Sequence, residues 1–456
     1  MEKTILQSTS KKEASTVSVR QKFTELRDAA NSTFAERKEQ VELLLLALLS
    51  KQNAFLLGVP GTAKSALVRY IQESIVDSTG FQILLSKFTT PEQVFGPFDV
   101  KKFEEGAYEV LTDGYLPKAD VAFLDEIWKS SNAILNSLLT LVNERKFANG
   151  NKNEDCPLVS AFAASNELPQ SAELNALYDR FMLRSVVKPV STARTLTSLF
   201  GGKSFKSAPA ITLDELAQAH EEIKNVKVPA AVKSDAAKII FALRKEGIEI
   251  SDRAAIAACA ESNPITGEKT LSVIKAVAWL DGRTSVESSD LGVLIHCFWY
   301  DPEEIPVVVK TVLKTANPYE QKAVQFEDQL RKLKSEVEKK IESGESVLSA
   351  TSDVHTKVVN IKASIAKIIG ESGDDANTTK VKRLKEVAKE SEKMIMNFLT
   401  LLPEKLEMLS LNLLCSCRAS GSHHHNRHGP SSEGSIYFWI FPKRPLTLPH
   451  NSLRYM

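Results

Sequence analysis

The chain has 456 residues, of which 25% are charged and 43% are hydrophobic, the ordinary composition of a soluble protein with about three domains. Lys and Arg total 58 against 57 Asp and Glu, so the net charge of +1 excludes a basic coat for nucleic acid over the whole chain, though not a local patch. No apolar run reaches the roughly 18 residues of a membrane span, and five scattered cysteines indicate a reducing compartment rather than a disulfide framework. We therefore expect a cytoplasmic, multidomain protein.

Five short apolar runs in the first half of the chain predict an α/β domain. Each run is apolar throughout, which favours parallel strands covered on both faces, and helical or turn-rich segments separate the runs. Between the second and third runs, the segment 104–116 alternates around Gly106 and Asp113–Gly114, a pattern that predicts an inserted β-hairpin. The expected strands are 53–58, 82–88, 121–124, 159–164 and 181–187.

Composition divides the chain into six segments. The polar N-terminus is expected to be a disordered arm, and a Gly/Ser/Lys-rich linker separates the α/β core from an all-helical module. Apolar residues three or four apart, with a turn at Gly370–Thr379, predict an antiparallel, coiled-coil-like helical hairpin, whose apolar stripe forms its own core or binds a partner. The His-rich C-terminus is expected to be disordered, since its Cys and His spacing matches no standard zinc site. The boundaries are 1–20 for the arm, 21–195 for the core, 196–210 for the linker, 211–305 for the helical module, 318–410 for the hairpin and 411–456 for the tail.

The segment Gly58–Ser65 (GVPGTAKS) has the placement of a phosphate-binding loop. It follows the first apolar run and precedes a helix, so backbone N–H groups and the helix N-terminus would face an anion. Lys64 would reach the β- and γ-phosphates of ATP, and the Ser65 hydroxyl would bind Mg²⁺. Ala63 replaces the glycine of the general pattern, which is acceptable if that residue has a helical φ. The expected nucleotide-binding residues are Gly58, Pro60, Gly61, Thr62, Ala63, Lys64, Ser65 and Ala66.

Two acidic residues end the third apolar run. Asp125 and Glu126 would lie at the carboxyl edge of the sheet, beside the phosphate-binding loop. Asp125 would hold Mg²⁺ through water, and Glu126 would polarise the attacking water. A lone acidic pair at a strand end is usually solvated, but a pair about 60 residues after a phosphate-binding loop favours catalysis.

Polar residues at the next two strands complete the candidate site. Asn166 ends the fourth run, where its amide could contact the γ-phosphate or the attacking water. Arg180 precedes the fifth run and could reach the nucleotide of a neighbouring subunit, with Arg184 as the competing candidate. Either arginine, taken alone, could also be a surface ion-pair residue.

As a set, these motifs resemble the MoxR family of AAA+ ATPases, and specifically its RavA subfamily. The resemblance covers roughly residues 20–305. It is carried by Gly58–Ser65, Phe88–Phe98, Val121–Glu126, Ser165–Pro169, Leu177–Phe181, Ile250–Arg253, Asp281–Arg283 and Trp299–Asp301.

The resemblance implies an AAA+ P-loop core of sheet order 5-1-4-3-2, an α-helical lid and a hexameric ring. The hairpin would be the helix-2 insert, Asn166 sensor 1, Arg180 the arginine finger and Arg253 sensor 2. Relatives act as chaperone-like remodellers, often paired with a von Willebrand factor A (vWA) domain protein. Two features depart from the family: the segment 263–269 is longer, and the β-rich module of RavA is not recognised beyond residue 317.

The sequence therefore favours Mg²⁺-dependent ATP hydrolysis by a ring that remodels protein complexes. A nucleic-acid motor is the main alternative, but Glu104, Glu105, Glu109 and Asp113 in the insert would repel phosphates. A metal-chelatase motor subunit would differ only in its partner. A catalytically weak scaffold is disfavoured because the loop lysine and the acidic pair are intact.

Overall fold

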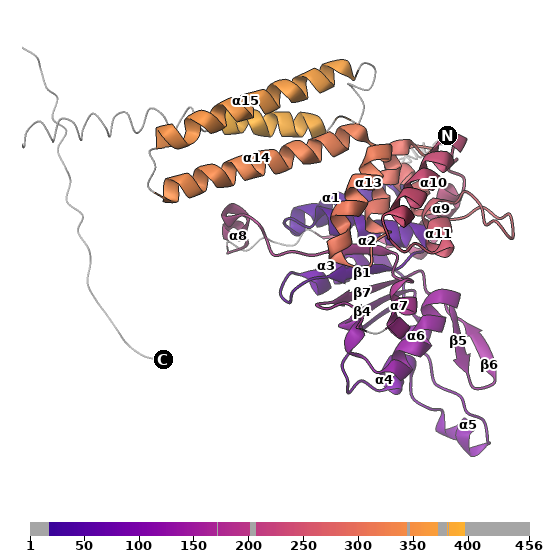
Figure 1. Cartoon of the computed structure of the whole chain (residues 1–456). Coiled ribbons are helices and arrows are strands. Elements are labelled where there is room, and N and C mark those ends of the chain that lie inside the picture. The colour runs from indigo at the N-terminus through magenta and orange to yellow at the C-terminus, as the bar shows by residue number, and fades with distance from the viewer. Residues whose placement is uncertain are drawn as a thin grey trace, which may run out of the picture. The chain divides into compact units, whose positions relative to one another are not determined.

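The structure is a computed structural model that describes residues 18–170, 172–200, 207–343, 347–372, 381 and 383–396 (Figure 1). The expected tail 411–456 and most of the expected arm 1–20 lie outside these residues. Helix α1 (Val19–Thr33) begins inside the expected arm, because the Ser18 side chain caps it by accepting a hydrogen bond from the Gln21 N–H.

Five parallel strands form the core sheet in the order β3-β4-β7-β1-β8. When the five strands are numbered 1 to 5 in chain order and the sheet is read from β8 to β3, this is the order 5-1-4-3-2 that the resemblance implied. The sequence located four strands to within one or two residues, but β3, at one edge of the sheet, starts before the expected run 82–88 and ends at Leu84, where a turn follows. Only Phe81 of β3 is buried, so its apolar residues mark this strand poorly. The strands are β1 (Ala54–Leu57), β3 (Gly80–Leu84), β4 (Val121–Asp125), β7 (Ser160–Ser165) and β8 (Leu183–Val186).

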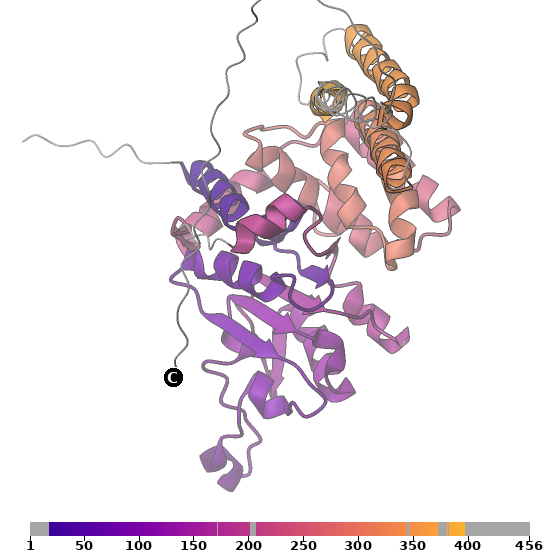
Figure 2. The same cartoon turned by 90° about the vertical axis from the view of Figure 1, so that its left-hand side faces the viewer.

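Helices cover both faces of this sheet (Figure 1 and Figure 2). Alternate residues of a strand point to opposite faces, so Ala54 and Leu56 pack in one apolar cluster while Phe55 and Leu57 pack in the other. The first cluster includes α2 (Lys38–Ser50) and α3 (Lys64–Glu73), and the second includes α6 (Asn132–Glu144) and α7 (Ala172–Tyr178).

The lid shares the first apolar cluster with the core. Ten of the thirteen residues of α2 are buried, because α2 packs on the sheet on one side and on lid helices α9 and α12 on the other. The lid also extends to Ala316, beyond the expected end at residue 305, and α8 (Ala193–Phe200) occupies part of the expected linker 196–210. The lid comprises β9 (Ile211–Thr212), which pairs with β2 (Ile75–Val76), α9 (Leu213–Lys224), α10 (Ala230–Lys245), α11 (Asp252–Cys259), α12 (Val273–Leu280), the 3-10 helices η3 (Ser288–His296) and η4 (Pro302–Glu304), and α13 (Ile305–Ala316).

The insert after β3 differs in form from the expected hairpin at 104–116. Its chain passes through α4 (Pro91–Phe95), α5 (Val100–Glu104) and η1 (Leu116–Lys118), and the antiparallel pairing is one bridge between Phe98 and Val110. The Asp99 carboxylate accepts hydrogen bonds from the backbone of Lys101 and Lys102, so helix capping prevails over the alternating pattern.

A true β-hairpin lies elsewhere, in β5 (Lys146–Asn149) and β6 (Lys152–Asp155). The sequence interpretation missed it because both strands are largely polar, although Gly150-Asn151, which joins them, is a typical pair for a two-residue hairpin turn. Gly150 has a φ of 59°, and a Cβ atom there would lie 2.1 Å from the Tyr108 carbonyl oxygen. This close approach fixes the hairpin against the insert.

The region expected to be one helical hairpin contains three helices. They are α14 (Pro318–Glu342), α15 (Val347–Glu371) and a helical stretch over 383–396. Arg383 of the third helix donates to Glu320 and Glu327 of α14, and Lys362 of α15 pairs with Glu392. Helix α15 ends at Glu371, near the expected turn, but the sequence interpretation missed that α14 ends at Glu342 and a new helix begins at Val347. Within the part of the chain that the structure describes, no helix is both long and apolar enough to cross a membrane.

The junction of core and lid generates a prediction about pH. His220 of α9 is buried, its Nε2 lies 2.9 Å from the Leu48 carbonyl oxygen of α2, and burial lowers its pKa to about 4. The unfolded chain therefore takes up a proton between about pH 6.5 and 4 that the folded protein excludes, so stability falls as pH falls through this window. We expect His220 to account for up to about 3 kcal/mol of this loss.

Urea unfolding at pH 7 and pH 4.5 measures this effect. The variant His220→Gln keeps an N–H donor for Leu48 but cannot titrate, so it should lose less stability on acidification than the wild type. An equal loss in the two proteins would contradict the prediction.

Candidate functional site

The loop after β1 has the shape of an anion-binding cradle. Gly58 follows β1, and a Cβ atom there would lie 2.3 Å from the Val187 carbonyl oxygen, so only glycine fits. Gly61 has a φ of 78°, and α3 begins at Lys64. The loop therefore turns from a buried strand into a helix N-terminus, the arrangement that binds phosphates.

Ala63 has a left-handed backbone conformation, with φ 64° and ψ 23°. This corrects the sequence interpretation, which accepted alanine there on the assumption of a helical φ. A left-handed conformation costs an L-residue roughly 1–2 kcal/mol, which explains why glycine is the general choice at this position.

Arg37 supports the loop from outside the motif. This buried residue lies at the N-terminus of α2, and its Nε–H donates to the Thr62 carbonyl oxygen at 3.2 Å. Burial lowers its pKa. The sequence interpretation missed Arg37 because a contact across 25 residues leaves no local signal.

The loop and the acidic strand meet as expected. The Ser65 hydroxyl donates to Asp125 Oδ2 at 2.8 Å, which joins residues 60 positions apart. The buried Lys64 amine donates to the carbonyl oxygens of Gly58 at 2.6 Å and Val59 at 3.0 Å. Burial lowers the pKa of Lys64, while Asp125 and Glu126 act in the opposite direction.

A hydroxyl and a carboxylate in direct contact form a donor set of hard oxygen atoms. Mg²⁺ prefers oxygen ligands and keeps several waters, so Ser65 and Asp125 fit this ion.

Glu126 follows Asp125 in a strained conformation. Its φ is 54°, and it begins the 3-10 helix η2 (Ile127–Lys129). Its Oε2 atom is buried and lies 3.2 Å from Lys129 Nζ, an ion pair that the sequence interpretation did not foresee. Because strain of this kind is common at active sites, the geometry is compatible with a catalytic carboxylate.

Asn166 lies at the same edge of the sheet. It follows β7, whose last residue, Ser165, is level with Leu57 of β1. The Gly58 N–H donates to the Ser165 carbonyl oxygen at 3.0 Å. Asn166 is thus adjacent to the start of the phosphate-binding loop, as the sequence predicted.

A cavity of about 540 Å³ adjoins the loop support. It lies between α2, the end of β8 and the lid, and Arg37 connects it to the loop. Its volume is in the range of small-molecule sites. Its lining includes Arg37, Gln40, Ser185, Lys188 and Trp299.

Arg180 lies at the opposite edge of the sheet. It precedes β8, which runs parallel to β1. In this pairing, Ala54 at the start of β1 lies level with Leu183 at the start of β8. The four residues of β8 alone span about 13 Å. Arg180 is therefore separated from the phosphate-binding loop of its own chain by the length of the sheet.

Arg184, the competing candidate for the finger, is disfavoured by its buried surroundings. It is 1% exposed, and its guanidinium carbon lies 4.2 Å and 4.5 Å from the ring centres of Tyr178 and Tyr300. Its nitrogens donate to backbone carbonyl oxygens, including those of Phe181 and Trp299. A side chain enclosed in this way cannot reach another subunit.

Arg253 lies beside Arg180 rather than at the phosphate-binding loop. Its Nε and Nη2 atoms donate to Asp179 Oδ2 at 3.1 Å and 2.9 Å. The structure thus brings together two groups of predicted residues, with the loop, acidic pair and Asn166 at one edge of the sheet and the two arginines at the other.

Two family models match this chain, and Arg253 lies between the two matched regions. A family model described as the MoxR domain in the MoxR-vWA-beta-propeller ternary systems matches residues 21–227, and an AAA lid domain model matches residues 267–312.

Similar whole proteins include two from Methanocaldococcus jannaschii. The uncharacterised protein MJ0812 is 35% identical over 316 residues, which cover 69% of this chain and 81% of that protein. The uncharacterised protein MJ0079 is 34% identical over 377 residues, which cover 81% of this chain and 95% of that protein. The crystal structure of a candidate ATPase from Cytophaga hutchinsonii shares the fold, with a TM-score of 0.51 and 19% identity over 66% of this chain and 95% of that chain.

The loop geometry predicts the effect of removing Lys64. The variant Lys64→Ala should bind ATP at least about tenfold more weakly, because a charge-assisted contact to the phosphates is lost. Isothermal titration calorimetry with ATP and Mg²⁺ measures the affinity, and Lys101→Ala, on the exposed face of α5, is the matched control. Equal affinities in the two variants would remove the phosphate-binding interpretation.

Proposed function

Because the chain belongs to the MoxR-type AAA+ ATPases, we propose that it forms a ring that hydrolyses ATP with Mg²⁺ and remodels protein complexes. The observation that carries this proposal is the contact between Ser65 and Asp125, with Lys64 and Glu126 next to it. This arrangement joins a phosphate-binding loop, a magnesium donor set and a carboxylate base at one edge of the sheet.

Each residue of this edge has a proposed role. Lys64 would exchange its two loop carbonyl partners for phosphate oxygens, and Asn166 would orient the attacking water. Glu126 would accept a proton from that water once its ion pair with Lys129 opens. Bound Mg²⁺ would neutralise charge on the phosphates. The cavity beside Arg37 is the proposed place of the nucleotide base, since it lies next to the loop.

The position of the arginines supports a ring. Phosphoryl transfer needs positive charge on the side of the γ-phosphate that faces away from the loop. Arg180 lies across the sheet from its own loop, so we propose that it serves the nucleotide of the next subunit, as an arginine finger. Arg253, at the same edge, would act with it on the neighbouring nucleotide. A hexamer is the assembly that the family resemblance favours.

The partners are proposed from the family model and from the insert. The name of the matched model supports a vWA domain protein as partner. The insert presents the exposed apolar residues Val100, Phe103 and Leu111 next to Glu104 and Glu105, which suits a polypeptide client better than a phosphate backbone. Chaperone-like action in the cytoplasm and membership of a RavA-like subfamily stay predictions. The described residues after 317 form helices without a β-rich module.

The catalytic role of Glu126 can be tested directly. The variant Glu126→Gln should bind ATP normally and hydrolyse it about 10² times more slowly or worse, because the base is lost while the shape is kept. A coupled phosphate-release assay gives the rate, and Glu144→Gln, at the exposed end of α6, is the control. Hydrolysis at the wild-type rate would place the base elsewhere.

The shared site can be tested by mixing two inactive variants. Arg180→Ala should bind ATP but hydrolyse it roughly 10³-fold more slowly, the usual effect of losing an arginine finger. Mixing it with Lys64→Ala should restore activity, since some interfaces then pair an intact loop with an intact finger. The restored rate should rise with protein concentration. A mixture that co-assembles, as judged by light scattering, and yet stays inactive would contradict a finger supplied by the neighbour.

A further inference from the structure

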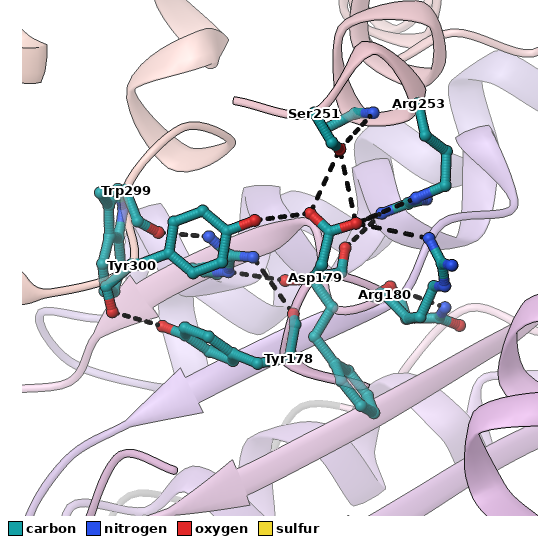
Figure 3. Close-up of polar contacts among 11 residues, drawn as sticks. Tyr178, Asp179, Arg180, Ser251, Arg253, Trp299 and Tyr300 are labelled. Atoms are coloured by element: carbon teal, nitrogen blue, oxygen red, sulfur yellow. Dashed lines mark hydrogen bonds and ion pairs between the residues drawn. The ribbon is translucent and has the colours of Figure 1, made fainter. Parts of the chain in front are cut away.

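One carboxylate connects the two arginines at the far edge of the sheet (Figure 3). Asp179 Oδ2 accepts hydrogen bonds from Arg253 at 2.9 Å and 3.1 Å and from Arg180 Nη1 at 3.3 Å. Its Oδ1 accepts a hydrogen bond from the Tyr300 hydroxyl at 2.7 Å, and the Ser251 hydroxyl lies 3.4 Å away. Asp179 and Arg180 belong to the core, whereas the other three residues belong to the lid.

We infer that Asp179 is a positioning residue, which holds Arg180 and Arg253 together as one pair and so sets the geometry in which they meet the phosphates of a neighbouring nucleotide. This inference rests on the proposed function, because it assumes that Arg180 acts on another subunit. Asp179 thus has a role in orienting the arginines, and the Tyr300 hydroxyl supports it. This role is separate from those of the phosphate-binding loop and the acidic strand.

Electrostatics supports this role. Two neighbouring guanidinium groups repel each other, and a carboxylate oxygen shared by both offsets that repulsion. Burial alone would raise the pKa of Asp179, but the Tyr300 hydroxyl and Arg253 hold it below its ordinary value. Asp179 therefore stays charged at neutral pH. Arg184 also acts electrostatically to lower this pKa, so the surroundings of the carboxylate are rich in positive charge, which favours the approach of a phosphate group.

The backbone of Arg180 is fixed independently. Asn53 donates its side-chain N–H to the Arg180 carbonyl oxygen at 3.0 Å, and Arg145 in turn donates to Asn53 Oδ1 at 3.1 Å. These contacts fix the backbone of Arg180 but leave the direction of its side chain to be set by other groups. Among the described residues, its Nε is buried without a hydrogen-bond partner, so Asp179 is the group that orients the guanidinium.

The lid contacts give the carboxylate its own support. Arg253 lies in the first turn of α11, whose N-cap is Ser251, and the Tyr178 hydroxyl donates to the Tyr300 carbonyl oxygen at 3.2 Å. The Asp179 side chain is 15% exposed, so these contacts are sheltered and are not a solvated surface ion pair. A movement of the lid would reach the finger through this one side chain.

The test is a double-mutant cycle in the full-length protein. Asp179→Asn keeps the size of the side chain and removes its charge. We expect kcat for ATP hydrolysis to fall about tenfold, with KM within about twofold of the wild type, because the residue acts on neither ATP binding nor the base. In an Arg180→Ala background, the same substitution should cause a clearly smaller further loss of kcat, because only Arg253 remains of the two groups that Asp179 positions.

Two variants complete the design. Tyr300→Phe removes only the hydroxyl and keeps the ring on Arg184, so it should lower kcat about threefold with an unchanged melting temperature. Asp252→Asn, whose side chain is 87% exposed and pairs with Arg244, is the control that should leave kcat unchanged. If Asp179→Asn fails to fold, the Tyr300→Phe cycle with Arg180→Ala decides the question in the same way.

The outcomes separate the inference from the proposed function. If Arg180→Ala is slow and both Asp179→Asn and Tyr300→Phe hydrolyse ATP at the wild-type rate, the inference is overturned and the finger stands. A loss of kcat that is equally large in the Arg180→Ala background would also overturn it, because the carboxylate would then act independently of Arg180. Wild-type hydrolysis by Arg180→Ala itself would overturn the finger and, with it, the role of Asp179.

Discussion

All five core strands run in the same direction, and this constraint divides the chemistry of the chain between the two edges of one sheet. Groups that follow a strand, such as Lys64, Asp125 and Asn166, gather at the carboxyl edge. Arg180, which precedes a strand, is confined to the amino edge. A single chain therefore carries its two groups of candidate site residues at opposite edges of one sheet.

The predictable part of the fold was the part with a continuous apolar signal. β4 and β7 are buried on both faces, so their residues mark them directly, whereas β3 lies at an edge and its boundaries were misplaced. The β5–β6 hairpin was missed because its strands are polar and only Gly150-Asn151 marks its turn. The end of α14 at Glu342 was missed because its apolar seam suggested one continuous helix over this region.

The site residues that the sequence could predict were those with a local signal, and those that depend on distant contacts were not predictable. Gly58–Ser65 and Asp125 were predictable because each motif lies within one strand and the residues after it. The φ of Ala63 could not be inferred, since sequence specifies the residue type but not the conformation that its neighbours impose. Nor could Arg184 be separated from Arg180, because the rings that enclose Arg184 include Tyr300, more than a hundred residues away.

The burial of α2 limits how the chain can move. Its apolar residues belong at once to the core and to the lid, so swinging the lid away would expose a row of leucines to water. Each exposed leucine would cost about 2 kcal/mol, which makes a wide hinge opening within one chain unfavourable. Core and lid should thus behave as one stiff body and melt cooperatively.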